Sequence, residues 1–400
     1  MDLNQESLNL HAQLGGKLEI HPKFKVKNRH DLSLVYSPGV AAVCKAIAED
    51  PSKVYDYTMK RNTVAIITDG SAVLGLGNIG AKAALPVMEG KALLFKEYAD
   101  IDAFPLCLDT QNTYEIISIV KALAPSFAGV NLEDISAPRC FEIERALESI
   151  GIPVFHDDQH GTAIVLLAGL INAVKLAGKE LQELKVVING AGAAGTAIAE
   201  LLLCIGHDPN VCVSVREVVV CDTKGILSQS RNDILSNPEK ARLARFTNRG
   251  QLEGTLQDAV RDADVFIGVS VGGALKTEWV KTMAKDPIIF ALANPDPEID
   301  PEAARQAGAF IVGTGRSDYP NQINNVLAFP GIFRGTLDAR APRITQHMQV
   351  RAAHALADMV EDLSRENIIP SALDKSIAYR VGKAVKKAWE EEQPQPEGSL

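Results

Sequence analysis

The sequence is poor in cysteine and aromatic residues and has no long run of apolar or like-charged residues. Its six cysteines lie at irregular spacings and form no CxxC pair, so we expect reduced core cysteines and exclude a zinc ribbon or a disulfide framework. No stretch of about 18 uninterrupted apolar residues is present, so we expect no membrane partner. A net charge of −9 without basic clusters argues against nucleic acid as a partner.

The length and the average composition favour a globular protein of two domains. At 400 residues the chain exceeds what one hydrophobic core usually organises, so a cleft between two cores is expected. Apolar residues make up 46% and charged residues 23%, which is typical of a soluble globular protein. The first residues, MDLNQESLNL, are polar and acidic and lack the apolar core of a secretion signal. We therefore expect a cytoplasmic protein.

Short β-branched runs alternate with helical patterns, which predicts an α/β fold with parallel sheets. TVAIIT, DAFPLCL and PVFH belong to a first unit, and KVVING, EVVVCD, ADVFIGVS, PIIFALAN and AFIVGTG to a second. We predict an N-terminal substrate and metal domain over residues 1–160. A Rossmann-type, doubly wound dinucleotide-binding domain should follow over residues 161–385, its last helices packing back on the first domain. Residues 391–400 are predicted to be a disordered tail.

A glycine-rich turn directly after the strand KVVIN predicts a dinucleotide site. The first glycine allows the tight turn, the second lets the backbone approach a pyrophosphate, and the third lets helix and strand pack closely. The predicted contacts are Gly190, Gly192, Ala193, Ala194 and Gly195. A second match to this glycine pattern, in VLGLGNIG, does not follow its strand directly, so we interpret it as a loop of the substrate domain.

Asp222 ends the next strand and is the candidate partner for the adenosine ribose hydroxyls. It follows Gly190 by 32 residues, more than the usual spacing of about 20, and a polar insert accounts for the difference. A carboxylate there suits NAD because it repels a 2′-phosphate. Lys224 and Arg231 follow closely and suit NADP, so the sequence leaves the choice between NAD and NADP open.

Two acidic pairs lie at the ends of short apolar runs. Glu133 and Asp134 follow one run, and Asp157 and Asp158 follow the next. Parallel neighbouring strands would bring these ends to one edge of a sheet. Clustered carboxylates without matching basic residues repel one another, and a hard divalent cation resolves that repulsion. The sequence therefore predicts a site for Mg²⁺ or Mn²⁺, although any one of these acids taken alone would favour the interpretation of a solvated loop carboxylate.

Lys91 and Tyr36 are candidate acid–base groups. Lys91 lies among apolar residues of a predicted helix, and a lysine in an apolar cleft near a cation loses its proton more easily. Tyr36 precedes a Pro-Gly turn, from which a phenol can project into a cleft. Taken alone, both residues are also compatible with purely structural roles.

At these residues the sequence resembles the short bacterial malic enzymes over about residues 5–390. The shared motifs are YSPGVA, TDGSAVLGLGNIG, LPVMEGKALLF, NLEDISAPRCFEIE, PVFHDDQHGTAI, NGAGAAG, ALANPDPEI and GTGRSDYPNQINNVLAFPGIFRG. The resemblance implies that Lys91 is the general base and Tyr36 the general acid. The implied metal ligands are Glu133, Asp134 and Asp157, with Asp158 outside the ligand set. Asn294 and Asn325 match asparagines that hold the substrate carboxylate, Asn294 also lying beside the cofactor.

The implied reaction is metal-dependent oxidation and decarboxylation of L-malate to pyruvate and carbon dioxide with NAD or NADP, together with decarboxylation of oxaloacetate. The resemblance also implies a homodimer or higher homo-oligomer. Ala72 occupies the place where the long eukaryotic malic enzymes carry an arginine for the substrate carboxylate. Two alternatives remain: a malolactic enzyme, which would return the hydride to form lactate, and a non-catalytic dinucleotide sensor built on a dehydrogenase fold.

Overall fold

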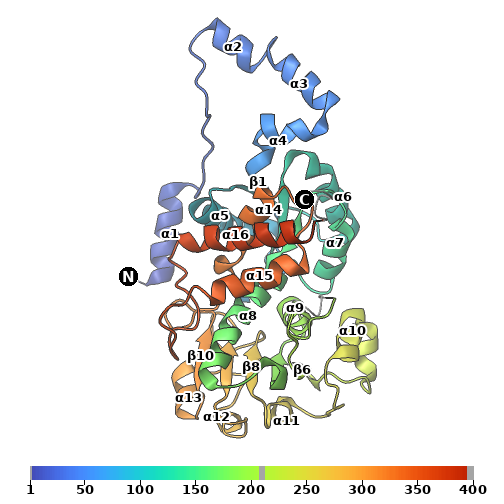
Figure 1. The fold of residues 1–400 in the computed structure, drawn as a ribbon, viewed down its shortest axis with the longest axis vertical. Coiled ribbons are helices and arrows are strands. Elements are labelled where there is room, and N and C mark those ends of the chain that lie inside the picture. The colour runs from blue at the N-terminus through green and yellow to red at the C-terminus, as the bar shows by residue number, and fades with distance from the viewer. Residues whose placement is uncertain (1, 207–211, 394–400) are drawn as a thin grey trace, which may run out of the picture.

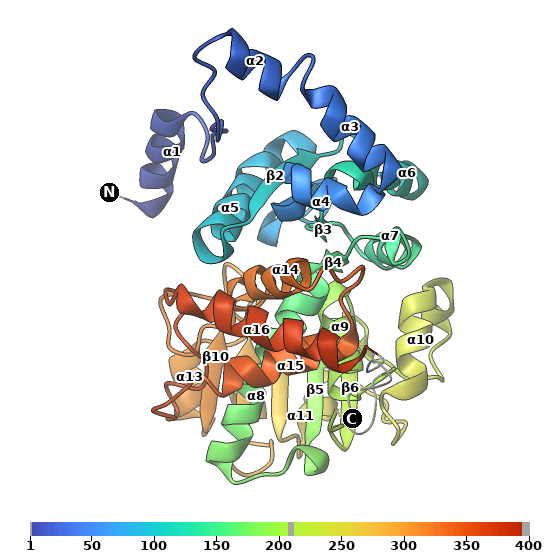
Figure 2. The ribbon, with the colours of Figure 1, turned by 45° about the horizontal axis from the view of Figure 1, so that its top comes forward.

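Two parallel sheets, each flanked by helices, form the body of the molecule (Figure 1, Figure 2). The computed structural model describes residues 2–206 and 212–393. The first sheet has the strand order β2-β1-β3-β4. Its strands are β1 (Thr63–Thr68), β2 (Asp102–Cys107), β3 (Gly129–Leu132) and β4 (Val154–His156). The predicted α/β class is confirmed in this sheet, because every pairing in it is parallel.

The second sheet has the order β10-β9-β8-β5-β6-β7. Its strands are β5 (Lys185–Asn189), β6 (Glu217–Asp222), β7 (Gly225–Ile226), β8 (Val265–Gly268), β9 (Ile288–Ala291) and β10 (Ile311–Thr314). All pairings are parallel except that of the short edge strand β7 with β6. The chain reverses its direction of winding between β5 and β8, which is where doubly wound sheets bind their ligands.

Helices connect the strands and cover both sheets. The first unit contains α5 (Ala81–Ala99), α6 (Thr113–Leu123) and α7 (Arg139–Leu147). The second contains α8 (Asp157–Ala177), α9 (Ala193–Leu202), α10 (Pro238–Phe246), α11 (Leu256–Val260), α12 (Thr277–Val280) and α13 (Pro301–Gln306). Helix α8 begins at the edge of the first sheet and continues into the second unit, so it runs across the boundary predicted at residue 160.

Three C-terminal helices join the two units: α14 (Phe329–Asp338), α15 (Gln346–Ala357) and α16 (Ser376–Glu391). Helices α14 and α16 both contact α5, and α15 contacts α8. The contact between α5 and α14 is aromatic, with the ring centroid of Phe95 4.7 Å from that of Phe329 and 5.3 Å from that of Phe333. A continuous apolar core therefore holds α5 in place. Most of the predicted tail, residues 391–400, lies outside the described residues.

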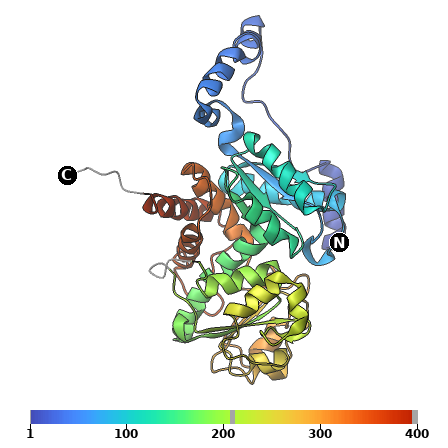
Figure 3. The ribbon, with the colours of Figure 1, turned by 90° about the vertical axis from the view of Figure 1, so that its right-hand side faces the viewer.

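The N-terminal segment, which we call the arm, begins beside this body and then extends away from it before it reaches the first sheet (Figure 1, Figure 3). It contains α1 (Leu3–Leu14), α2 (Arg29–Val35), α3 (Val40–Glu49) and α4 (Val54–Tyr57). None of these four helices contains a buried residue. The exposed large apolar side chains of the arm include Leu3, Leu8, Leu10, Leu14, Ile20, Phe24, Leu32, Leu34 and Val35. So much exposed apolar surface on one segment indicates a surface for association.

Two helical segments, Arg29–Glu49 and Asp157–Ala177, are long and apolar enough to cross a membrane by length and composition alone. The second is α8, whose apolar window is 72% buried inside the protein, as in a core helix. The first includes α2 and α3, which are separated by the cis peptide bond between Ser37 and Pro38. Both segments contain charged residues, so neither has the uninterrupted apolar run of about 18 residues that would predict a membrane span from the sequence.

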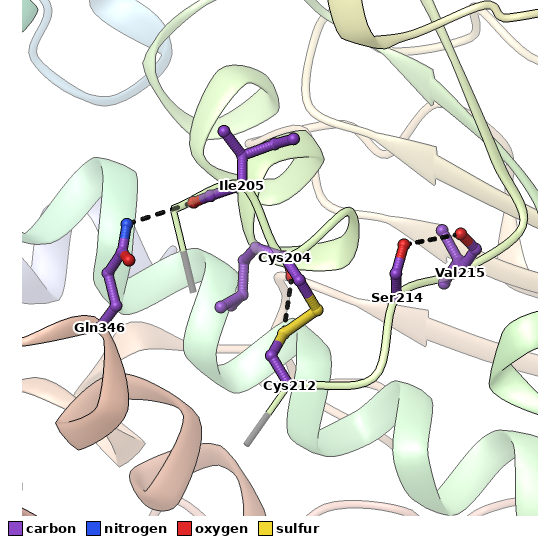
Figure 4. Close-up of a disulfide and its surroundings, with 7 residues drawn as sticks. Cys204, Ile205, Cys212, Ser214, Val215 and Gln346 are labelled. Carbon is purple, nitrogen blue, oxygen red and sulfur yellow. Dashed lines mark hydrogen bonds between the residues drawn. A yellow bond between two sulfur atoms is a disulfide. The ribbon is translucent and has the colours of Figure 1, made fainter. Parts of the chain in front are cut away.

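The prediction that all six cysteines are reduced is wrong for Cys204 and Cys212, which form a disulfide (Figure 4). Cys204 follows the end of α9 with a left-handed backbone, φ 54°, so the chain turns sharply there. The two Cα atoms lie 5.8 Å apart, which is the usual separation for a bridge. The spacing of the cysteines in the sequence does not predict that these two side chains come together. Cys44, Cys107, Cys140 and Cys221 are free thiols.

Candidate active site

The two acidic pairs meet at the carboxyl edge of the first sheet. Glu133 and Asp134 directly follow β3, and Asp157 and Asp158 are the first residues of α8, directly after β4. Strands β3 and β4 are parallel neighbours, with Leu132 paired to His156. The strand ends and the start of α8 therefore bring all four carboxylates to one place.

Within this group the structure separates Asp157 from the other three acids. Glu133, Asp134 and Asp158 each offer an oxygen, and these oxygens lie within 4.8 Å of one another. The backbone N–H of Asp134 donates to Oδ2 of Asp158 over 2.7 Å, which holds the two residues together. Asp157 is not part of this group of oxygens and forms an ion pair with Lys91, as Glu133 also does. The arrangement differs from the ligand set implied by the resemblance, which included Asp157 and left out Asp158.

Lys91 is buried, with 7% of its side chain exposed, and lies between carboxylates and an aromatic ring. Its Nζ is 2.9 Å from Oε1 of Glu133 and also donates to Oδ2 of Asp157. The ring of Phe329 lies beneath the ammonium group, with 4.1 Å between Nζ and the ring centroid. Helix α5 provides this placement because Lys91 lies on its buried face together with Met88 and Phe95.

Without a cation nearby, the electrostatic environment of Lys91 favours its charged form; the expectation of an easily deprotonated lysine applies to the site with its cation bound. Burial lowers the pKa of Lys91, but the charges of Asp157 and Glu133 outweigh burial and hold that pKa above its ordinary value. Burial also raises the pKa of Glu133 and of Asp157 to about 7 each, and that of Asp158 to about 6. Without a further cation, the single lysine does not fully compensate the charge of the buried carboxylates.

The donor set fits a divalent cation. Three carboxylates offer oxygens at mutual distances that one small ion can bridge, and hard oxygen donors are what Mg²⁺ and Mn²⁺ prefer. Such an ion would supply the positive charge that Lys91 alone does not provide to the buried carboxylates. The geometry therefore fits the predicted metal type, with Glu133, Asp134 and Asp158 as the residues able to hold it.

Several residues that the sequence did not single out orient this cluster. Asn131, fully buried on β3, donates from Nδ2 to Oε2 of Glu133 over 2.8 Å. Glu144 of α7 accepts from the backbone N–H of His156 and from the ring of His160, which holds the start of α8. Arg139 pairs with buried Asp69 over 2.7 Å. Alternation along β3 is the one sequence signal that could have identified Asn131.

The two predicted substrate-binding asparagines, Asn325 and Asn294, differ in their surroundings. Asn325 lies beside the cluster, because a Cβ on Gly161 would be 1.8 Å from Oδ1 of Asp157 and 3.3 Å from Cβ of Asn325. Asn294 is exposed on the loop after β9, and its carbonyl oxygen approaches Gly75. Gly75 belongs to the second glycine-rich segment, which is a loop before α5.

Tyr36 lies on the arm, between α2 and α3. It is 70% exposed, and its side chain makes no hydrogen bond or ion pair within the described residues. Within one subunit, no hydrogen bond or ion pair among the described residues links the phenol of Tyr36 to Lys91. The predicted acid and the predicted base therefore remain apart within the described part of one chain.

The second sheet forms a cradle for a dinucleotide. Gly190 has φ 132°, and a Cβ there would lie 2.5 Å from the carbonyl oxygen of Val269. A Cβ on Gly195 would lie 1.8 Å from the carbonyl oxygen of Gly190, whereas the space beside Gly192 is open. Helix α9 begins here and presents its N-terminus. A cavity of about 450 Å³ adjoins the turn, lined by Gly190, Gly192, Asp222, Ser270 and, from the first unit, Ala137 and Phe141.

The chain combines a glycine cradle on a doubly wound sheet with a buried group of acids and one lysine. This combination defines the class of nicotinamide-dependent dehydrogenases that act on a small acid with metal assistance. A family model described as the malic enzyme NAD-binding domain matches residues 159–389, and one for the malic enzyme N-terminal domain matches residues 15–148. The chain belongs to the malic enzyme family.

Relatives with known names agree with this family. The chain is 58% identical to the bifunctional malic/malolactic enzyme of Bacillus subtilis, over 97% of this chain and 93% of that one. It is 57% identical to the NAD-dependent malic enzyme of Geobacillus stearothermophilus, over 94% of this chain and 77% of the relative. The crystal structure of the NAD-dependent malic enzyme of Thermotoga maritima matches with a TM-score of 0.90 and 53% identity, covering 95% of this chain and 98% of that one.

The close packing of Gly161 against Asp157 gives a test of the site geometry. In Gly161→Ala the new methyl group would overlap Oδ1 of Asp157 and displace that carboxylate from Lys91. We expect kcat/KM for malate to fall about 100-fold, because small displacements of positioning groups have effects of that size. Far-UV circular dichroism should remain that of the wild type.

Gly90→Ala is the matched control, since Gly90 neighbours Lys91 on α5 and no atom lies within 4 Å of a Cβ built there. It should keep wild-type kcat/KM and gain up to about 1 kcal/mol of stability from helix propensity. Wild-type kcat/KM in Gly161→Ala would contradict the described packing of Asp157.

Proposed function

We propose that this malic enzyme oxidises and decarboxylates L-malate to pyruvate and carbon dioxide, using NAD or NADP and Mg²⁺ or Mn²⁺, and that it also decarboxylates oxaloacetate. The observation that carries the proposal is the buried lysine within a cluster of carboxylates, in a chain that also forms a dinucleotide cradle. A dehydrogenase that only moved hydride would need no such cluster of hard oxygen donors. A non-catalytic dinucleotide sensor would need neither the cluster nor the lysine.

We assign Glu133, Asp134 and Asp158 as the metal ligands and Lys91 as the general base. This ligand set replaces Asp157 by Asp158, because oxygens of Glu133, Asp134 and Asp158 lie within 4.8 Å of one another and Asp157 is not part of that group. When bound, the cation supplies a Lewis acid and the positive charge that lowers the pKa of Lys91, while the nicotinamide accepts the hydride.

The residues around the substrate hold it and move its protons. Lys91 takes the proton of the malate C2 hydroxyl, and Asp157 orients the lysine through their ion pair. Asn294 and Asn325 hold the substrate carboxylate, since Ala72 leaves no arginine in that loop. The burial of Lys91 keeps water away from the group that carries the proton.

The final proton donor is Tyr36, which protonates C3 of enolpyruvate. Tyr36 is on an arm without buried residues, so we propose that the arm packs on a second copy of the chain and that Tyr36 completes the partner's site. The exposed apolar side chains of the arm would be buried in such a homodimer. This arrangement explains why the phenol and Lys91 make no contact within one chain.

The alternative activity, conversion of malate to lactate, is not favoured over the main one. The name of the Bacillus subtilis relative includes both activities, so the resemblance does not select the malolactic reaction alone. Product analysis separates them, because lactate without net reduced cofactor would indicate the malolactic reaction. We place the enzyme in the cytoplasm, where nicotinamide cofactors and malate are available, and propose neither nucleic acid nor membrane as a partner.

The revised ligand set predicts different effects for the two neighbouring aspartates. Asp158→Ala should weaken Mn²⁺ binding by about 100-fold or more and abolish both malate oxidation and oxaloacetate decarboxylation. Asp157→Asn should weaken Mn²⁺ binding much less, because it chiefly disturbs Lys91. Isothermal titration with Mn²⁺ measures both. If Asp157→Asn loses more Mn²⁺ affinity than Asp158→Ala, then Asp157 is the ligand and the revised set is wrong.

The shared site predicts complementation between two inactive variants. Lys91→Ala and Tyr36→Phe should each be nearly inactive as homodimers. In a randomly mixed population, half of the dimers are hybrids with one intact site of two, so activity should recover to about a quarter of wild type. Activity after co-expression, with hybrids counted by native mass spectrometry, is the measurement. Hybrids without recovered activity would show that Tyr36 acts within its own chain or is structural.

A further inference from the structure

The carboxylate of Glu144, on α7, binds three residues at the start of α8. Its Oε1 accepts from the backbone N–H of His156 and from Nε2 of His160, both over 3.0 Å. Its Oε2 accepts from Nε2 of Gln159 over 3.0 Å and lies 3.1 Å from the same ring nitrogen of His160. Only 14% of the Glu144 side chain is exposed. One largely buried carboxylate therefore holds the N-cap residue and the first turn of α8 together.

The same turn of α8 carries two carboxylates of the candidate active site. Asp157 and Asp158 are the first two residues of the helix, and Gln159 and His160 are the next two. Successive residues lie about 100° apart around a helix axis, so the two pairs point to opposite sides of the turn. On one side Asp157 pairs with Lys91. The carboxylate from α7 holds the other side, so a rotation of the turn that broke this contact would also move both acids.

The ring of His160 continues this support toward the helix that carries Lys91. Its centroid lies 5.5 Å from that of Phe155. Phe155 in turn contacts Phe333 of α14 with 6.0 Å between the centroids, and Phe333 contacts Phe95 of α5 at 5.3 Å. Lys91 lies one turn before Phe95 on α5. Because these rings lie in a close-packed core, the position of His160 is tied to that of α5.

Glu144 is not itself one of the candidate metal ligands. The oxygens that lie within 4.8 Å of one another belong to Glu133, Asp134 and Asp158. Within the part of the chain that the structure describes, the side-chain hydrogen bonds of Glu144 all go to residues 156–160 and to none of these acids. A cavity of about 1120 Å³ adjoins Glu144 on the side of α8 where this contact lies. Any effect of Glu144 on a bound ion is therefore transmitted through the turn.

We propose that Glu144 and His160 are positioning residues of the reaction. Together they fix the rotation of the first turn of α8, which sets the affinity for the divalent cation and aligns Asp157 with Lys91. The inference rests on the proposed function, because it takes Asp158 as a ligand and Lys91 as the base. It goes beyond that function by giving a role to two residues that are neither candidate ligands nor acid–base groups.

The test measures cation binding and dinucleotide binding separately, by isothermal titration calorimetry with Mn²⁺ alone and, without metal, with 5′-ADP. In Glu144→Ala, Mn²⁺ should bind about tenfold more weakly, since groups that orient metal-binding side chains have effects of that size. At saturating Mn²⁺, kcat should also fall, because Asp157 no longer aligns Lys91. The affinity for 5′-ADP should stay that of the wild type. A general defect in α8 would weaken both, because α8 packs against the cradle helix α9.

Two further variants at the same position separate position from bulk stability. Glu144→Gln keeps an oxygen that can accept from His156 and His160, the two bonds that Oε1 makes, so most of the Mn²⁺ affinity and kcat should be retained. Glu144→Asp keeps the charge but shortens its reach by one carbon. If Glu144→Ala does not fold, Glu144→Asp carries the same test, with a smaller loss of Mn²⁺ affinity and unchanged 5′-ADP binding expected.

Glu148→Ala is the matched control. Glu148 ends α7 one turn after Glu144, lines the same cavity, and its side chain makes no hydrogen bond or ion pair within the described residues. This variant removes the same charge and should behave as wild type in every measurement.

Three results would overturn the proposal: wild-type Mn²⁺ affinity in Glu144→Ala, an equal loss of Mn²⁺ and 5′-ADP binding, or no recovery in Glu144→Gln. In each case malate oxidation by the wild-type enzyme would leave the proposed function intact. A wild-type enzyme that neither bound Mn²⁺ nor oxidised malate would instead defeat the proposed function itself.

Discussion

A lysine ammonium buried among carboxylates at the edge of the first sheet is the interaction on which the site depends. Removing each ion from water costs several kcal/mol, so the group persists only where opposite charges and hydrogen bonds compensate it. Glu133 and Asp157 compensate Lys91, and Asn131 satisfies Glu133. The remaining negative charge is what prepares the site for a divalent cation.

The fold keeps these groups in register through elements from distant parts of the chain. Lys91 is on α5, and the aromatic contact between Phe95 and Phe329 holds α5 against a C-terminal helix. Asp157 and Asp158 open α8, which then becomes the core helix of the second unit. The acidic cluster and the dinucleotide cradle are therefore fixed to one continuous core. The arm carries Tyr36 outside this core, which suits a proton donor supplied by a second subunit.

The structure could be predicted from the sequence where a local pattern is compatible with only one structure. The strands, the glycine turn at Gly190 and the meeting of two acidic pairs follow from periodicity and from parallel pairing. It could not distinguish Asp157 from Asp158, because neighbouring residues at a strand-to-helix junction differ only in the direction of their side chains. The approach of Lys240 to Asp222, the return of Cys212 to Cys204 and the exposure of Tyr36 depend on tertiary contacts that spacing does not encode.

The most direct test of the account is a crystal structure with Mn²⁺, using anomalous scattering to locate the ion. We expect one strong peak per subunit, with carboxylate oxygens of Glu133, Asp134 and Asp158 at about 2.1 Å and with Lys91 nearby but not coordinated. Such a peak would establish that the buried cluster is the metal site of the reaction. A peak coordinated by Asp157 in place of Asp158, or one away from β3 and α8, would contradict the account.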